Sequence, residues 1–252
     1  MIQCKYCGEI FPKLVKAHII PRSFYKVIRG DDKHSIEFAI GESDENKKIW
    51  QSGIHDSNIV CEECEKLFGE FDKHGYEVLP AALAQKNIWH DSNGHPCAYL
   101  VEKVDYHKLK LFFLSMLWRA HASTHIFRGH IKLGCHESII RSCISKKIGS
   151  SHDDSEIIMF HPLNQSYSNL IIPPWPQEFY GVNFYRFYLP GVIALIKVDE
   201  RPLPDNLKPI ILNQSTPHRL FFYNDNDFES SEMRYIEKIK ALMRLRSNGL
   251  EV

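Results

Sequence analysis

Two short stretches, CKYC at residues 4–7 and CEEC at residues 61–64, decide the fold of the amino-terminal part of this chain. In a C-x-x-C pair two thiolates on one tight turn reach the same metal ion, and two such pairs supply the four ligands that zinc prefers. A full set of four thiolates leaves no open coordination position, so we expect a structural zinc. Its ligands are Cys4, Cys7, Cys61 and Cys64. Gly8 supports this interpretation, because such turns often need a positive φ directly after the second thiolate. The alternative is a chance spacing of unpaired cysteines.

The composition is that of an ordinary globular protein. The chain has 252 residues, of which 44% are hydrophobic, enough for a sizeable core. Lysine plus arginine and aspartate plus glutamate both number 31, so net charge gives no reason to expect general binding to nucleic acid or membrane. The first residues lack the pattern of a signal peptide, and no apolar run is long enough to span a bilayer. We therefore expect a cytoplasmic protein without membrane contact, whose reduced cysteines bind metal.

The chain divides into two predicted parts. Residues 1–80 form the zinc-stapled module, with a charged loop insertion near residues 29–50. Residues 100–252 form an α+β domain of unknown role, in which helices and an antiparallel sheet are combined. Asp105 is placed to cap a buried helix that runs towards His125. Further helices are expected at about residues 136–148 and 228–246.

Short runs of β-branched and aromatic residues predict the strands of a mostly antiparallel sheet. The runs are EIIMFH (156–161), NLIIP (169–173), VNFYRFYL (182–189), VIALIKVD (192–199), KPIILN (208–213) and HRLFFYND (218–225). Pro190 and Gly191 predict a hairpin turn between the third and fourth runs. The PPWP stretch at residues 173–176 is expected to kink an edge between two strands.

A histidine motif and an asparagine motif accompany the cysteine pairs. LVKAHIIPRSFY spans residues 14–25, and DSNIV at residues 56–60 runs directly into the second pair. In this order the chain resembles the HNH endonucleases of the His-Me finger superfamily, in the subgroup that carries a four-cysteine zinc. The matching residues are Cys4, Cys7, His18, Pro21, Asn58, Cys61 and Cys64. The resemblance covers about the first 75 residues and leaves the rest of the chain unexplained.

The resemblance implies hydrolysis of nucleic-acid phosphodiester bonds, with DNA as the expected substrate, on a ββα-metal fold. His18, at the end of the first strand, would be the general base that takes a proton from the attacking water. An imidazole suits this role because its ordinary pKa of about 6.5 leaves it neutral near pH 7. Asn58 would lie on the second strand and hold the His18 ring or the backbone in place, or contact the metal as it does in some members of the family. A catalytic Mg²⁺ or Mn²⁺ ion would neutralise charge on the phosphate.

The chain departs from the family at both positions that usually bind the catalytic metal. Ala17 precedes the proposed base, where the family often has Asp, Glu or His. Glu65 follows the last zinc cysteine, where the family often has His, and a carboxylate suits Mg²⁺ or Mn²⁺. Asp72 lies two helical turns farther on, at about the same face, so Glu65 and Asp72 are the candidate metal ligands. His55 and His74 are reserve candidates. Alternatively, the two acids are solvated positions on an acidic helix.

Positive charge is concentrated around the proposed base. Residues 1–30 contain six lysines and arginines but a single acidic residue, Glu9. Such residues can contact phosphates with little dependence on base sequence. The candidate nucleic-acid contacts are Lys13, Lys16, Arg22 and Lys26. A solvated basic face is the simpler alternative.

Three functional hypotheses follow. The first is a metal-dependent HNH-type endonuclease in a bacterial anti-phage or mobile-element system, with a partner protein that controls cleavage. The second is a module of the same fold whose catalytic metal site has decayed and which binds nucleic acid or a protein partner. Ala17 favours this second hypothesis. In the third, the zinc only staples the fold and the carboxyl-terminal part carries the function.

Overall fold

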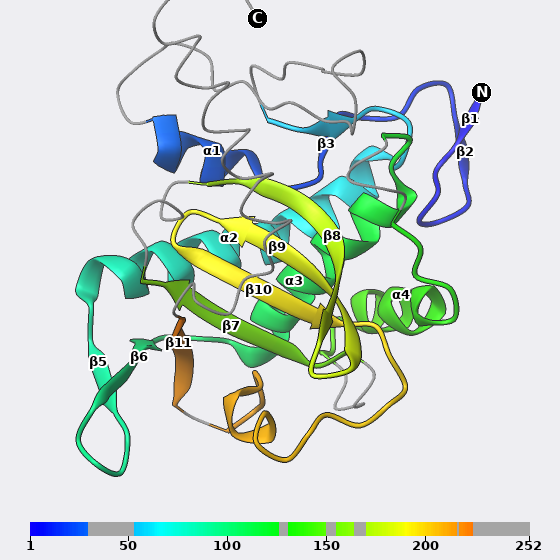
Figure 1. Cartoon of the computed structure of the whole chain (residues 1–252). Helices are drawn as coiled ribbons and strands as arrows, with labels where there is room; N and C mark the ends of the chain where they lie inside the picture. The colour runs from blue at the N-terminus through cyan, green and yellow to red at the C-terminus, as the bar shows by residue number, and fades with distance from the viewer. Residues whose placement is uncertain (30–52, 126–130, 150–154, 164–169, 216, 224–252) are drawn as a thin grey trace, which may run out of the picture.

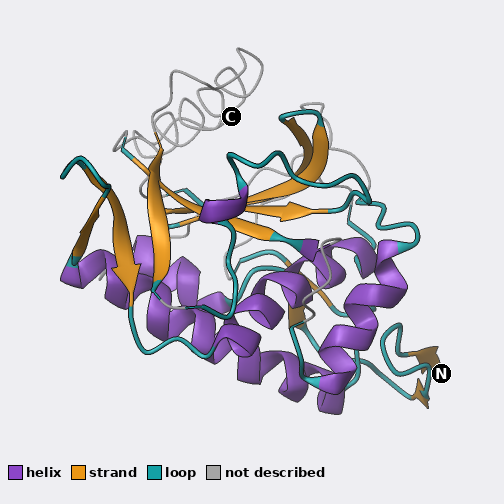
Figure 2. Cartoon of the chain, turned by 90° about the horizontal axis from the view of Figure 1, so that it is seen from below, coloured by secondary structure: helices purple, strands orange, loops and turns teal. Residues whose placement is uncertain are grey.

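A seven-stranded sheet with helices packed against one of its faces forms the body of the protein (Figure 1, Figure 2). The computed structural model describes residues 1–29, 53–125, 131–149, 155–163, 170–215 and 217–223. The helices are α1 (Arg22–Arg29), α2 (Glu62–Gln85), α3 (Tyr106–Ala122) and α4 (His136–Lys146). In the part of the chain that the structure describes, no helix combines the length and the apolar character needed to cross a bilayer.

The large sheet has the strand order β5-β6-β11-β7-β10-β9-β8, and all neighbours are antiparallel except β11 and β7. Its strands are β5 (Ile88–His90), β6 (Pro96–Val101), β7 (Ile157–Pro162), β8 (Ile172–Phe179), β9 (Val182–Leu189), β10 (Val192–Lys197) and β11 (His218–Tyr223). Two smaller antiparallel sheets pair β1 (Ile2–Gln3) with β2 (Ile10–Phe11), and β3 (Ala17–His18) with β4 (His55–Asp56). In the chain, β4 is followed by α2.

The predicted α+β class is confirmed, as are several of its elements. Asp105 caps α3, because its side chain accepts a hydrogen bond from the Lys108 backbone N–H at 3.1 Å. The second predicted helix is α4, and β9 and β10 form the expected hairpin. The turn of that hairpin has Gly191 at a φ of 72°, a conformation that glycine adopts without steric cost. The predicted helix at 228–246, and residues 30–50 of the predicted insertion, lie outside the described residues.

Two predicted strand features differ in part from the structure, and proline contributes to both differences. The first half of KPIILN forms a short 3₁₀ helix at Lys208–Ile210, in which Pro209 occupies a first-turn position that needs no N–H donor. In its second half Ile211 makes an isolated antiparallel bridge to Ile158 of β7. The irregular edge predicted at PPWP is present, but it lies inside the edge strand β8 and not between two strands. A strand at the edge of a sheet tolerates proline, and β8 accommodates it with a shift of register between Ile172 and Trp175.

One cluster of buried side chains runs from Cys4 to Leu220 and so includes residues of both predicted parts. Helix α3 lies at its centre, between α2 on one side and strands of the sheet on the other. Gly75 lets α2 and α3 approach closely, because a Cβ atom there would lie 2.5 Å from the ring of Phe112. Buried side chains of the amino-terminal segment, from Cys4 to Tyr25, therefore share a hydrophobic core with one set of strand residues, while other strand residues belong to a second cluster.

Candidate functional site

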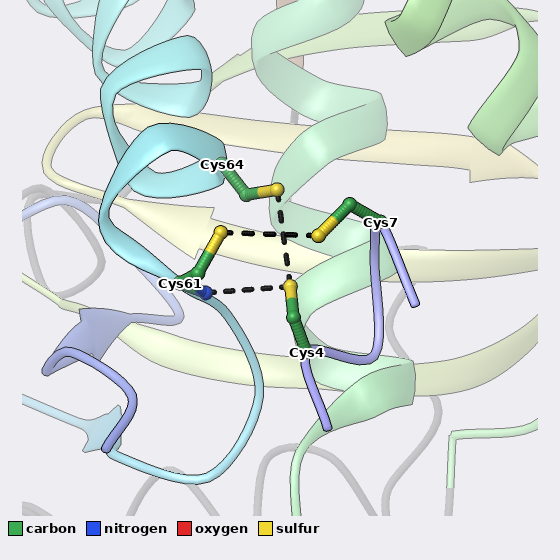
Figure 3. Close-up of side chains that lie close together, drawn as sticks. All are labelled: Cys4, Cys7, Cys61 and Cys64. Carbon is green, nitrogen blue, oxygen red and sulfur yellow. Dashed lines mark hydrogen bonds between the residues drawn. The ribbon is translucent and has the colours of Figure 1, made fainter. Parts of the chain in front are cut away.

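The four cysteines of the two C-x-x-C pairs converge on one point (Figure 3). The first pair lies in the turn between β1 and β2, and the second lies at the start of α2. All four sulfur atoms lie within 4.8 Å of one another. The Sγ–Sγ distances are 3.8 Å for Cys4 and Cys64, and 3.9 Å for Cys7 and Cys61. Four sulfurs arranged tetrahedrally at the zinc–sulfur distance of about 2.3 Å would be about 3.8 Å apart. The cluster therefore has the ligand type and the size of a tetrahedral thiolate site.

Backbone hydrogen bonds shape the first cysteine pair around the cluster. The Gly8 N–H donates to the Cys4 carbonyl at 2.9 Å, and Gly8 has a φ of 82°, as predicted. The Lys5 N–H donates to the Ile59 carbonyl at 2.8 Å, and the Cys61 N–H donates to the Cys4 sulfur at 3.3 Å. These contacts align two segments that are 57 positions apart in the chain.

The thiols of the cluster differ in acidity. Burial opposes ionisation of Cys4, but backbone N–H groups of Cys7, Cys61 and Tyr6 lower its pKa to about 7. Burial and the neighbouring sulfurs of Cys61 and Cys4 raise the pKa of Cys64 well above its usual range. A divalent cation would offset the repulsion among four thiolates, so metal binding at this cluster would release protons.

Helices α3 and α4 hold the first cysteine pair in place. The Arg141 guanidinium donates hydrogen bonds to the carbonyls of Tyr6 and of Lys5, the latter at 3.0 Å. The Tyr6 hydroxyl lies 2.8 Å from Ser145 Oγ, and Lys5 Nζ donates to the Ala122 carbonyl at 2.6 Å. The cysteine cluster is therefore anchored to the core helices and is not a separate appendage.

The small sheet of β3 and β4 places two histidines opposite each other. His18 pairs in register with His55, and their ring centroids are 5.6 Å apart. Both side chains are half-buried. His55 Nδ1 lies 2.9 Å from the Gly53 carbonyl oxygen, which orients its ring. The imidazole of the proposed base thus lies beside a second imidazole.

Asp56, next to His55 on β4, is a buried residue that the motif did not single out. Its carboxylate accepts hydrogen bonds from the backbone of Asn58 and from Ser123 and Thr124 at the end of α3. The Asp-Ser-Asn sequence carried a signal for this arrangement, because Asp side chains often bond the backbone N–H two residues on. Asp56 therefore connects the strand pair to α3.

The two candidate metal ligands on α2 lie in a buried charge cluster with Arg119 of α3. Asp72 accepts two hydrogen bonds from the Arg119 guanidinium, at 2.6 and 2.8 Å. The Arg119 side chain is 0% exposed and that of Asp72 is 16% exposed. Burial raises the pKa of Glu65, and the Arg119 charge opposes that rise. Among the described residues, Glu65 Oε2 is buried and has no hydrogen-bond partner.

His18, Glu65 and Asp72 do not together form a metal-binding group. Within the described ranges, the four cysteines are the one group of three or more His, Cys, Asp or Glu residues whose ligand atoms lie within 4.8 Å of one another. Asp72 uses both oxygens to bind Arg119, so it is not available to a cation in the expected way. Of the two acids, Glu65 is the one left with an oxygen that no described residue engages.

The remaining predicted site residues are exposed. Asn58 lies two residues beyond β4 and not on the strand, because the turn made by Asp56 ends the strand first. Its side chain faces solvent. The side chains of the four candidate phosphate contacts, on the segment before β3 and on α1, are all exposed. They are Lys13, Lys16, Arg22 and Lys26.

No protein-family model, no curated protein and no solved structure matches this chain. The resemblance to a nuclease family therefore depends on the motif residues of the sequence alone.

Proposed function

We propose that this protein is a metal-dependent nuclease of the HNH type that hydrolyses phosphodiester bonds in DNA. The observation that carries the proposal is the setting of His18. It lies on a two-stranded sheet that is followed by α2, and the four-cysteine cluster joins the start of that helix to the segment before His18. This order of histidine strand, second strand and helix is the one that the family resemblance implies.

In this proposal the four-cysteine cluster binds a structural zinc. The ligand set is complete without a water or a substrate group, so the ion stabilises the fold and takes no part in the reaction. Its role is to hold the start of α2, which carries Glu65, close to the strand that carries His18. The sulfur–sulfur distances of 3.8 and 3.9 Å support zinc over larger or harder cations.

His18 would act as the general base. It would accept a proton from water as the water oxygen bonds to phosphorus and the bond from phosphorus to the leaving oxygen breaks. Exposed basic side chains, of which Lys16 and Arg22 lie nearest to His18 in the chain, would hold the DNA backbone. When bound, a Mg²⁺ or Mn²⁺ ion supplies charge neutralisation at the phosphate. Glu65 is the acid best placed to contribute to such a site, since Mg²⁺ keeps several waters and needs few protein carboxylates.

A plasmid-nicking assay tests the proposal. We expect the wild type to nick supercoiled plasmid with Mg²⁺ or Mn²⁺, and His18→Ala to lower the rate at least about a hundredfold, the usual contribution of a general base. His90→Ala is the matched control, because His90 is an exposed histidine on β5 in the large sheet and should leave the rate unchanged. Cleavage that persists at full rate in folded His18→Ala would rule out the assigned base.

A second candidate function is binding without catalysis. Ala17 cannot bind a cation, and the ion pair of Asp72 with Arg119 removes a further acid from the proposed metal site. A binding module would be inactive with every divalent ion, yet would retain DNA with an affinity that falls steeply with salt. Fluorescence anisotropy with a labelled duplex at two salt concentrations, beside the nicking assay, separates the two functions.

A further inference from the structure

The Arg119 side chain of α3 binds both the backbone of His18 and the carboxylate of Asp72. Its guanidinium is completely buried in the middle of the protein, 0% exposed. Nη1 donates to the His18 carbonyl at 2.7 Å and to Asp72 Oδ2 at 2.8 Å, while Nη2 donates to Asp72 Oδ1 at 2.6 Å. Nε donates to the Ser115 carbonyl within the same helix. One side chain thus joins α3, α2 and the strand of the proposed base.

The other backbone polar group of His18 is also held by a charged side chain. The His18 N–H hydrogen bonds to the carboxylate of Glu65, and Glu65 is attracted to Arg119 in turn. The register of the small sheet makes these partners necessary. Ile19 N–H bonds across to the Ile54 carbonyl, so in an antiparallel ladder the N–H and C=O of the preceding residue point away from β4. Glu65 and Arg119 satisfy the two groups that β4 leaves open.

From these contacts we infer that Arg119 is a positioning residue for His18. Arg119 holds the His18 carbonyl, Glu65 holds the His18 N–H, and Asp72 fixes Arg119 through an ion pair. We call these three side chains the His18 clamp. The inference rests on the proposed nuclease function of His18. It gives Asp72 a role different from the metal ligand that the sequence predicts. The acid holds the guanidinium at the angle from which Nη1 reaches the His18 carbonyl.

The short length of β3 explains why such a clamp matters. A strand of two residues cannot hold its own orientation, whereas α3 is packed between α2 and the sheet and is buried along most of its length. Arg119 transfers this rigidity to the His18 backbone. Lysine cannot replace it, because a single ammonium group lacks the planar fork that binds Asp72 with two nitrogens while reaching a carbonyl with one of them.

The test is Arg119→Lys, which keeps the buried positive charge and removes the fork. We expect the single-turnover cleavage rate to fall about tenfold to a hundredfold, as for a small misplacement of a catalytic group, with the Kd for a DNA duplex unchanged. Hydrogen–deuterium exchange should become faster at the peptide containing His18. Asp72→Asn keeps the side-chain shape, and it should change the cleavage rate and the exchange in the same direction by a smaller amount. This variant replaces Arg119→Lys in the test if Arg119→Lys does not fold.

Lys197→Arg is the matched control for loss of stability. Lys197 at the end of β10 and Glu156 directly before β7 form a buried ion pair at 3.0 Å, with side chains 0% and 12% exposed, close to the values for Arg119 and Asp72. We expect Lys197→Arg to lower the Tm about as much as Arg119→Lys does, but to leave the cleavage rate unchanged. If Arg119→Lys and Lys197→Arg lower the rate per folded molecule equally, or not at all, the positioning role is overturned.

Failure of the proposed function has a different signature. A folded, metal-loaded wild type that never cleaves DNA would refute the nuclease proposal and with it the catalytic meaning of the clamp. Hydrogen–deuterium exchange would still test the positioning role of Arg119 in an inactive protein. If Arg119→Lys leaves the protection of the His18 peptide unchanged, that role is overturned whatever the activity.

Discussion

The Asp56 carboxylate is 2% exposed and accepts hydrogen bonds from four donors. The donors are the N–H of Asn58, the hydroxyl of Ser123, and the N–H and hydroxyl of Thr124, at 2.7 to 3.1 Å. Burial alone would raise the pKa of Asp56, but the hydrogen bonds from Thr124 and Asn58 outweigh it, so the pKa lies below its usual range. The ionised carboxylate is thus the form that the folded protein stabilises.

Asp56→Asn should therefore destabilise the protein in a pH-dependent way. At pH 7 we expect a loss of about 1–3 kcal/mol, the range for a buried charged hydrogen-bonding group. A carboxyl whose pKa is lower in the folded protein contributes stability above its unfolded pKa of about 3.9, and that contribution is lost as the pH falls through the folded value. Urea unfolding of the wild type and the variant should consequently converge below about pH 4.

An exposed acid provides the control for this prediction. Asp205→Asn changes a carboxylate whose side chain is 95% exposed, and it should alter the free energy of unfolding by less than about 0.5 kcal/mol. A difference between the wild type and Asp56→Asn that stays constant from pH 7 to pH 3 would contradict the assigned role of the Asp56 charge.

The elements that the sequence predicted well are those whose signals lie in neighbouring residues. Helix α3 has both its cap at Asp105 and its apolar periodicity within one stretch, and the β9–β10 hairpin has its turn between two apolar runs. The cysteine cluster was likewise predictable, because two fixed spacings define a ligand set. The clamp on His18 was not predictable, because Asp72 and Arg119 are 47 positions apart and meet only through the packing of two helices.

That helix packing depends on one glycine of α2. A Cβ atom at Gly75 would lie 2.5 Å from the Phe112 ring, which is completely buried and cannot move aside easily. Gly75→Ala should lower the free energy of unfolding by about 1–3 kcal/mol, as overpacking of a core does. Gly69 lies on the same helix with open space around its Cβ position. Gly69→Ala should stabilise the protein by up to about 1 kcal/mol, through helix propensity alone.

Urea denaturation of the two glycine variants decides the point. Opposite signs are expected, and equal stabilisation by both substitutions would show that α2 and α3 are not in the close contact described. The comparison also tests the proposed positioning of His18, because the packing of α2 against α3 brings Asp72 to Arg119.

At the scale of the whole molecule, the cysteine cluster and one set of strand residues of the large sheet share a hydrophobic core, so we expect them to unfold together. The hydrophobic cluster that contains Cys4 and Cys64 extends without interruption to strands of the large sheet. Arg141 and Lys5 bind the first cysteine turn to α4 and α3 by hydrogen bonds. Energy gained by metal binding at the cluster should accordingly stabilise the entire described fold and not the amino-terminal segment alone.

Removal of the proposed zinc should therefore lower the Tm of a single transition. A ligand present at a thousandfold excess over its Kd stabilises a fold by about 4 kcal/mol, which corresponds to about 10 °C for a protein of this size. We expect this shift in calorimetry after chelation, and we expect Cys61→Ser to show it without chelator and to lose bound zinc in elemental analysis. Cys135→Ser is the control, because Cys135 is exposed and outside the cluster.

The same cluster predicts the direction of the pH dependence of metal binding. The Cys64 thiol has a raised pKa, caused by burial and by the neighbouring sulfurs, so it must lose a proton when a metal binds. Zinc affinity measured by competition with a chelator should then rise between pH 6.5 and pH 8, with at least one proton released for each ion bound. A separate low-temperature transition would instead show that the amino-terminal segment unfolds independently of the sheet. A Tm that is indifferent to chelation would show that the cluster holds no metal that stabilises the fold, and the proposed role of the ion in holding the start of α2 near the strand of His18 would then be wrong.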